Sequence, residues 1–219
     1  MVLRRIRQTE RQQGELNMNT HSNVRKLTEL AILTAITVVL QFLGSAIRVG
    51  PFSVSLTLIP IIVGAVLHGP MAGAWLGLVF GTVVILSGDA AAFLAVNVPG
   101  TVVTCSVRGL LTGYTAGWVY HLGKKVSPVF GTFAAAVVSP VVNTGLFLVC
   151  CFLFFYDTVA GWGAAMGFSN AALYMVTAFV GVNFIVELAI NIVLAPTIVR
   201  LLNYIRKPAE KENKNDSGD

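Results

Sequence analysis

Residues 54–87, VSLTLIPIIVGAVLHGPMAGAWLGLVFGTVVILS, are the most informative part of the chain. Two apolar runs flank His68-Gly69-Pro70, a turn so short that it can join only two antiparallel helices. Each run approaches the roughly 20 residues with which an α-helix crosses a bilayer. The second run carries Gly73, Gly77 and Gly81 on one helix face, and small residues at this spacing let helices pack closely in lipid. We therefore predict a hairpin of two transmembrane helices.

The composition of the chain is that of a membrane protein. Of its 219 residues, 55% are hydrophobic and only 11% are charged, and the length fits one domain. The net charge of +5 could indicate a nucleic-acid partner, but the basic residues lie mostly in the two tails and one short loop, where they act as topology signals. Cys105, Cys150 and Cys151 lie in apolar runs without metal-ligand spacing, so we expect buried thiols, no metal site and no cofactor.

Working outward from the hairpin, the pattern predicts an all-α, polytopic membrane protein with six transmembrane helices. The expected helices are residues 26–45, the two limbs of the hairpin, and residues 101–120, 128–155 and 172–202. Lysine and arginine are concentrated at 25–26, 124–125 and 200–207, which share one side of the membrane if there are six spans. We expect a bacterial plasma-membrane protein, and because such residues mark cytoplasmic segments, both of its termini should lie in the cytoplasm.

The flanking segments complete the domain plan. Residues 1–25 form a polar, basic cytoplasmic tail without the apolar region of a signal peptide, and Met18 offers an alternative start. Residues 26–203 form the membrane domain, and the charged residues 204–219 are expected to be a disordered cytoplasmic tail. Gly88–Gly100 is too polar to span lipid and too apolar for a solvated linker, which indicates a re-entrant or capping segment.

Polar side chains inside the expected spans are the candidates for function, because each is costly to place in a bilayer. Four stand out, namely Arg108, Asn143, Asn183 and Glu187. Asn183 and Glu187 share one helix face with Asn191, so this face must turn toward protein or a cavity. We expect these residues to line a substrate-binding pocket.

The expected pocket opens to the outside, beneath a roof formed by residues 46–53, 88–100 and 156–170. Asn97 and Trp162 lie in two of these roofing segments and complete the candidate substrate-binding residues.

Four of the candidates also have a purely structural explanation. Asn143 could join helices by hydrogen bonds, and the Arg108 side chain could extend to the outer membrane interface. Glu187 could form an ion pair with Arg108 or stay protonated in a dry site. Trp162 could belong to the aromatic belt at the interface.

Missing motifs narrow the class of protein. The chain has no GxxxxGK[ST] loop, so it does not hydrolyse ATP itself, and it has no HExxH, GxSxG or Ser/His/Asp arrangement. An intramembrane enzyme is therefore not expected, and no selectivity-filter loop indicates a channel. A binding or carrier protein fits best, and it needs an ion gradient or a partner as its energy source.

Three features together resemble the substrate-binding S component of an energy-coupling factor (ECF) transporter. They are the segment LTLIPIIVGAVLHGPMAGAWLGLVFG at 56–81, the AxxxA step formed by Ala31 and Ala35, and the six-helix, basic-inside layout. The resemblance implies high-affinity capture of a vitamin or related micronutrient from outside. It also implies a transmembrane T component and two cytoplasmic ATPases as partners, with Ala31 and Ala35 on the face that docks to the T component. Alternatively, both alanines pack against the sixth helix of the chain itself.

The ligand is less well determined than the family. The resemblance places the site near the outer face, among the first outer loop and helices four to six. Arg108 would suit a carboxylate, and Glu187 with Asn183 would suit hydroxyl or amide donors. We expect few aromatic side chains at the pocket, which slightly favours pantothenate over riboflavin.

Two other classes stay open at this stage. In an ion-coupled secondary carrier, Glu187 would be the titrating or ion-binding carboxylate. A structural membrane protein would bind no small molecule.

Overall fold

The computed structural model describes residues 2–46, 48–49, 52–53 and 56–215. The longer helices are α1 (Val2–Ala46), α2 (Leu58–His68), α3 (Pro70–Leu86), α5 (Val98–Gly123), α6 (Pro128–Phe154), α7 (Tyr156–Ala165) and α9 (Gly181–Asn215). Short elements connect them: strands β1 (Arg48–Val49) and β2 (Phe52–Ser53), helices α4 (Ala91–Leu94) and α8 (Ala171–Tyr174), and the π-helix η1 (Met175–Phe179). The all-α prediction is confirmed.

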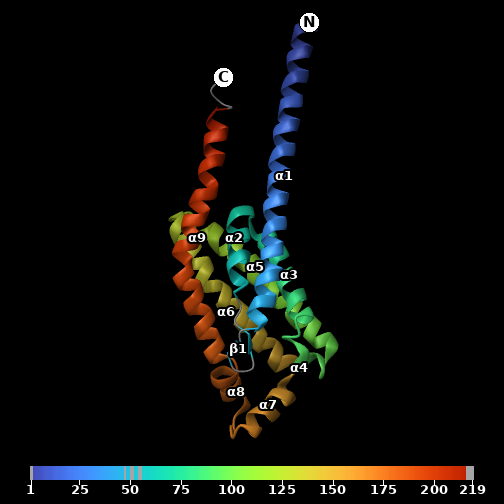
Figure 1. Ribbon diagram of the computed structural model, residues 1–219, viewed down its shortest axis with the longest axis vertical. Coiled ribbons are helices and arrows are strands. Elements are labelled where there is room, and N and C mark those ends of the chain that lie inside the picture. Colours follow the sequence, from blue (N-terminus) through green and yellow to red (C-terminus); the bar gives the residue numbers. More distant parts are fainter. Residues whose placement is uncertain (1, 47, 50–51, 54–55, 216–219) are drawn as a thin grey trace.

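The long helices run roughly along one axis, and this arrangement gives the molecule two distinct ends (Figure 1). Both termini lie at one end, whereas α4, α7 and α8 lie at the other. Within the described part of the chain, three segments are long and apolar enough to cross a membrane by themselves: 23–46, 128–154 and 171–202.

The predicted hairpin is present, but its two helices differ in length. Gly69 joins α2 to α3 with φ 93°, a conformation that suits glycine, and Pro70 occupies the first turn of α3, where its missing N–H costs nothing. However, α2 has only 11 residues and is therefore about 16 Å long, too short to cross a bilayer core of about 30 Å alone. The first limb is thus shorter than the sequence led us to expect, because the helix begins only at Leu58, and its crossing of the membrane stays a prediction.

Two glycine ladders form the tightest helix contact. The backbones of α3 and α5 touch at Gly73 against Gly113 and at Gly77 against Gly109, in an antiparallel arrangement. A Cβ atom on Gly77 would collide with the Gly109 carbonyl group, so no larger residue fits without moving a helix. Both ladders were visible in the sequence, and the structure shows that they pack on each other.

Two helix ends and one additional helix differ from the expected pattern. α1 begins at Val2, α9 continues to Asn215, and the roofing segment 156–170 contains helix α7. Residues 204–215 continue α9, and the Ala, Glu and Lys residues among them are strong helix formers, whereas a disordered tail at 204–219 stays a prediction. α7 forms because it buries Val159 against an aromatic cluster that includes Phe93, Phe147 and Phe155.

Candidate functional site

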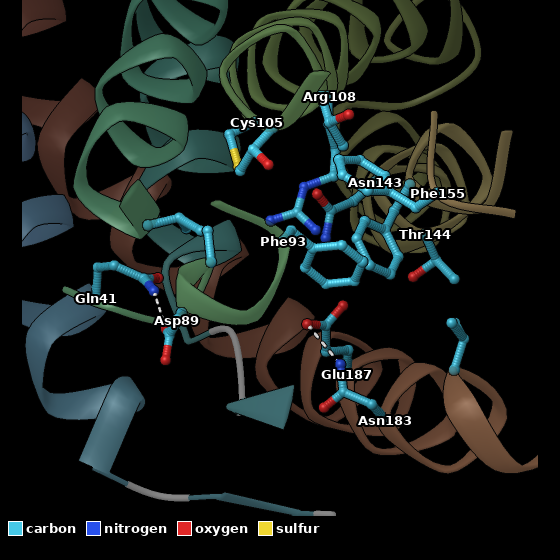
Figure 2. A pocket seen from close by; sticks show the side chains of 16 residues that line it. Gln41, Asp89, Phe93, Cys105, Arg108, Asn143, Thr144, Phe155, Asn183 and Glu187 are labelled. Carbon is cyan, nitrogen blue, oxygen red and sulfur yellow. Dashed lines mark hydrogen bonds between the residues drawn. The ribbon is translucent and has the colours of Figure 1, made fainter. Parts of the chain in front are cut away.

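A pocket lies between the helices, and the empty space within it, open solvent at its mouth included, is about 750 Å³. Its walls come from α1, the end of α3, the turn that follows it, α4, α5, α6 and α9. Its strongest polar groups are Gln41, Asp89, Arg108, Asn143, Asn183 and Glu187. Figure 2 shows that Arg108 and Glu187 project into the same space from opposite walls. The structure thus brings together all four of the intramembrane polar residues singled out in the sequence.

The Arg108 side chain on α5 contacts two aromatic rings. Its guanidinium carbon lies 5.4 Å from the ring centre of Phe80 and 5.2 Å from that of Phe147, both within cation–π range. The buried Nε atom has no hydrogen-bond partner among the described residues. The side chain points into the cavity and not along α5 toward an interface, so this cation is available to an anionic group.

Asn143 contributes a second polar group from α6. Its side chain is only 3% exposed, and its Oδ1 atom has no hydrogen-bond partner in the described part of the chain. A buried amide oxygen without a partner costs free energy, and a polar ligand could remove that cost. The neighbouring Thr144 also lines the cavity.

Asn183, Glu187 and Asn191 lie along one face of α9, as their four-residue spacing predicts. Asn183 Nδ2 donates to Glu187 Oε1 at 3.3 Å, and the Glu187 side chain is 2% exposed. Asn191 lies one turn further, outside the cavity, where its Nδ2 donates to the Glu187 backbone carbonyl at 2.8 Å. The π-helix η1 directly precedes this face, and π-helical turns are frequent at functional sites.

Gln41 and Asp89 were not predicted to bind substrate. Gln41 Nε2 on α1 donates to Asp89 Oδ2 at 2.8 Å, and Thr57 Oγ1 donates to Gln41 Oε1 at 3.3 Å. The rule that singled out Asn143 could have identified Gln41 too, because it is a polar residue within an apolar helix.

The cavity is more aromatic than expected. Phe93, Phe147 and Phe155 all line it, and Phe93 lies 5.7 Å from Phe147 and 4.9 Å from Phe155, ring centre to ring centre. The expectation of few aromatics at the pocket is therefore wrong. Phe93 is far in the sequence from Phe147 and Phe155, and only tertiary packing brings its ring against theirs.

Two predicted binding residues lie outside the cavity lining. Asn97 caps α5 by accepting a hydrogen bond from the Gly100 N–H at 2.9 Å. Trp162 packs against Phe93 with 5.7 Å between ring centres, behind the residue that faces the cavity. Their direct contact with a ligand stays a prediction.

Ala31 and Ala35 are exposed on α1. This helix packs mainly on α2 and α3, so the structure does not bury the two alanines against α9.

Comparison with known proteins identifies the class to which this architecture belongs. Residues 25–199 match the family described as "ECF transporter, substrate-specific component". The pantothenic acid transporter PanT of Lactococcus lactis subsp. cremoris (strain MG1363) is 31% identical over 194 residues, covering 81% of this chain and 93% of PanT. No solved structure matches the chain significantly. The family match and this relative, together with the apolar helices that enclose a polar cavity, show that the chain belongs to the substrate-specific components of ECF transporters.

Proposed function

We propose that this chain is the high-affinity binding subunit of an ATP-driven ECF importer and that its ligand is pantothenate. In this proposal it captures the vitamin from outside and passes it inward together with a T component and two cytoplasmic ATPases. Because the family is one of transporter subunits, the chain is not an enzyme.

The observation that carries the choice of ligand is the Arg108 guanidinium, which faces the cavity with a buried Nε atom that lacks a partner among the described residues. Pantothenate has a carboxylate, an amide, two hydroxyls and a branched apolar centre. Arg108 can bind the carboxylate through charge-assisted hydrogen bonds, and Asn143 can bond to the amide. Phe93 and Phe147 offer apolar surface for the methyl groups. The name of the relative PanT supports the same ligand.

Isothermal titration calorimetry tests this assignment with pantothenate and panthenol, the analogue in which an alcohol replaces the carboxylate. Arg108→Gln should weaken pantothenate binding about 10- to 100-fold, the loss expected for a charge-assisted bond, and should change panthenol binding little. Arg200→Gln, the same change at an exposed position of α9, is the matched control. Equal losses for both ligands would contradict a carboxylate site at Arg108.

The proposed topology has six spans with both termini in the cytoplasm. Two observations support it. Both termini lie at one end of the molecule, and most of the basic residues belong to the two terminal segments of the sequence. Phe93 of α4, which lines the cavity, then lies toward the opposite, outer end.

An ion-coupled carrier is the second candidate, and the nearly complete burial of Glu187 beside the cavity favours it. Vesicles that contain only this chain distinguish the two functions. An ion gradient should drive uptake by a carrier, and Glu187→Gln should abolish it, whereas an ECF subunit alone should show no gradient-driven uptake.

A further inference from the structure

The cavity contains two similar polar pairs on different walls. One is Asn183 with Glu187 on α9, and the other is Gln41 of α1 with Asp89 of the turn before α4. Each pair presents an amide donor next to a carboxylate acceptor. A hydroxyl group both donates and accepts, so each pair matches the chemistry of one hydroxyl.

Gln41 is held in a single orientation. Thr57, which is fully buried, donates to its Oε1 atom, and this bond directs the Nε2 atom toward Asp89 and the cavity. The amide nitrogen carries two protons, of which one goes to Asp89 Oδ2. No residue in the described part of the chain accepts the other. Gln41 is itself only 3% exposed, so this proton is directed into an enclosed site rather than into bulk water.

We propose that Gln41 is a specificity-determining residue that, together with Asp89, binds one of the two hydroxyls of the ligand. This inference rests on the proposed function, because the hydroxyls are those of pantothenate. The carboxylate lies at Arg108, one hydroxyl at Asn183 and Glu187, and the other at Gln41 and Asp89. Through Gln41, helix α1 becomes part of the binding site.

The test compares pantothenate with its dideoxy analogue, in which hydrogen replaces both hydroxyls, on the full-length protein. Gln41→Met keeps the length of the side chain and removes its polar atoms. Wild-type protein should prefer pantothenate, and Gln41→Met should weaken pantothenate binding about 10-fold or more while leaving the affinity for the analogue within about 2-fold. Thr57→Val, which removes only the bond that orients Gln41, should produce a smaller loss of the same selective kind.

Other outcomes have distinct meanings. Equal weakening of both ligands by Gln41→Met would overturn the proposal, because it would show that Gln41 only holds α1 against the α3–α4 turn. Unchanged binding of both ligands would overturn it as well. Arg108→Gln should weaken both ligands, since both carry the carboxylate. If the wild-type protein binds neither ligand, the proposed function itself fails, and the hydroxyl site falls with it.

Discussion

A comparison of Asn143 with Asn191 distinguishes a ligand-binding role of a buried asparagine from a structural one. Both are buried amides whose oxygen has no partner among the described residues, but only Asn143 lines the cavity. Asn143→Leu should weaken pantothenate binding about 10-fold or more without lowering the melting temperature, because it removes a buried polar group that the protein leaves unpaired. Calorimetry and thermal unfolding in detergent measure the two effects.

Asn191→Leu is the matched control and should leave the affinity unchanged. If Asn143→Leu instead lowered the melting temperature and left binding unchanged, Asn143 would be a helix-joining residue and not a ligand contact.

At the scale of single elements, the contact between α3 and α5 depends on the absence of side chains. Gly77→Ala should destabilise the protein by about 1–3 kcal/mol, because its Cβ would overlap the carbonyl of Gly109 and push the helices apart. Gly145→Ala on α6 meets open space and should leave stability unchanged or slightly raised. Thermal unfolding of both variants in the same detergent measures this difference. Equal melting temperatures for the two variants would contradict the tight contact between α3 and α5.

Helix α1 carries the face that we propose for docking. Replacing Ala31 and Ala35 together by Leu should abolish copurification with the T component, since small residues allow the close approach of helices. Pantothenate binding should be retained, because neither alanine lines the cavity. Ala189→Leu, an exposed alanine on α9, is the control and should preserve the complex. Retention of the complex by the double variant would place the docking surface elsewhere.

Sequence patterns revealed these elements to different extents. The glycine ladders and the Asn183–Glu187 spacing lie within single helices, so their periodicity is visible without a structure. The Gln41–Asp89 pair and the Phe93–Phe147 contact join residues far apart in the chain, and only tertiary packing creates them. The short length of α2 was missed because an apolar run does not show where its helix begins.

At the scale of the whole molecule, the proposed topology predicts which side of the membrane each loop faces. Val126, between α5 and α6, and Met166, after α7, are both exposed, whereas the native Cys105, Cys150 and Cys151 are buried. A membrane-impermeant maleimide added to intact cells should label Met166→Cys but not Val126→Cys, which should react only after permeabilisation. Labelling of Val126→Cys in intact cells would reverse the orientation.

Ligand capture is tested most directly by native mass spectrometry of the protein purified in detergent from cells grown in rich medium. We expect one bound molecule with the mass of pantothenate per chain, and we expect Arg108→Gln protein to be empty. A wild-type spectrum without bound ligand, unchanged after saturating pantothenate is added, would contradict pantothenate binding by this chain.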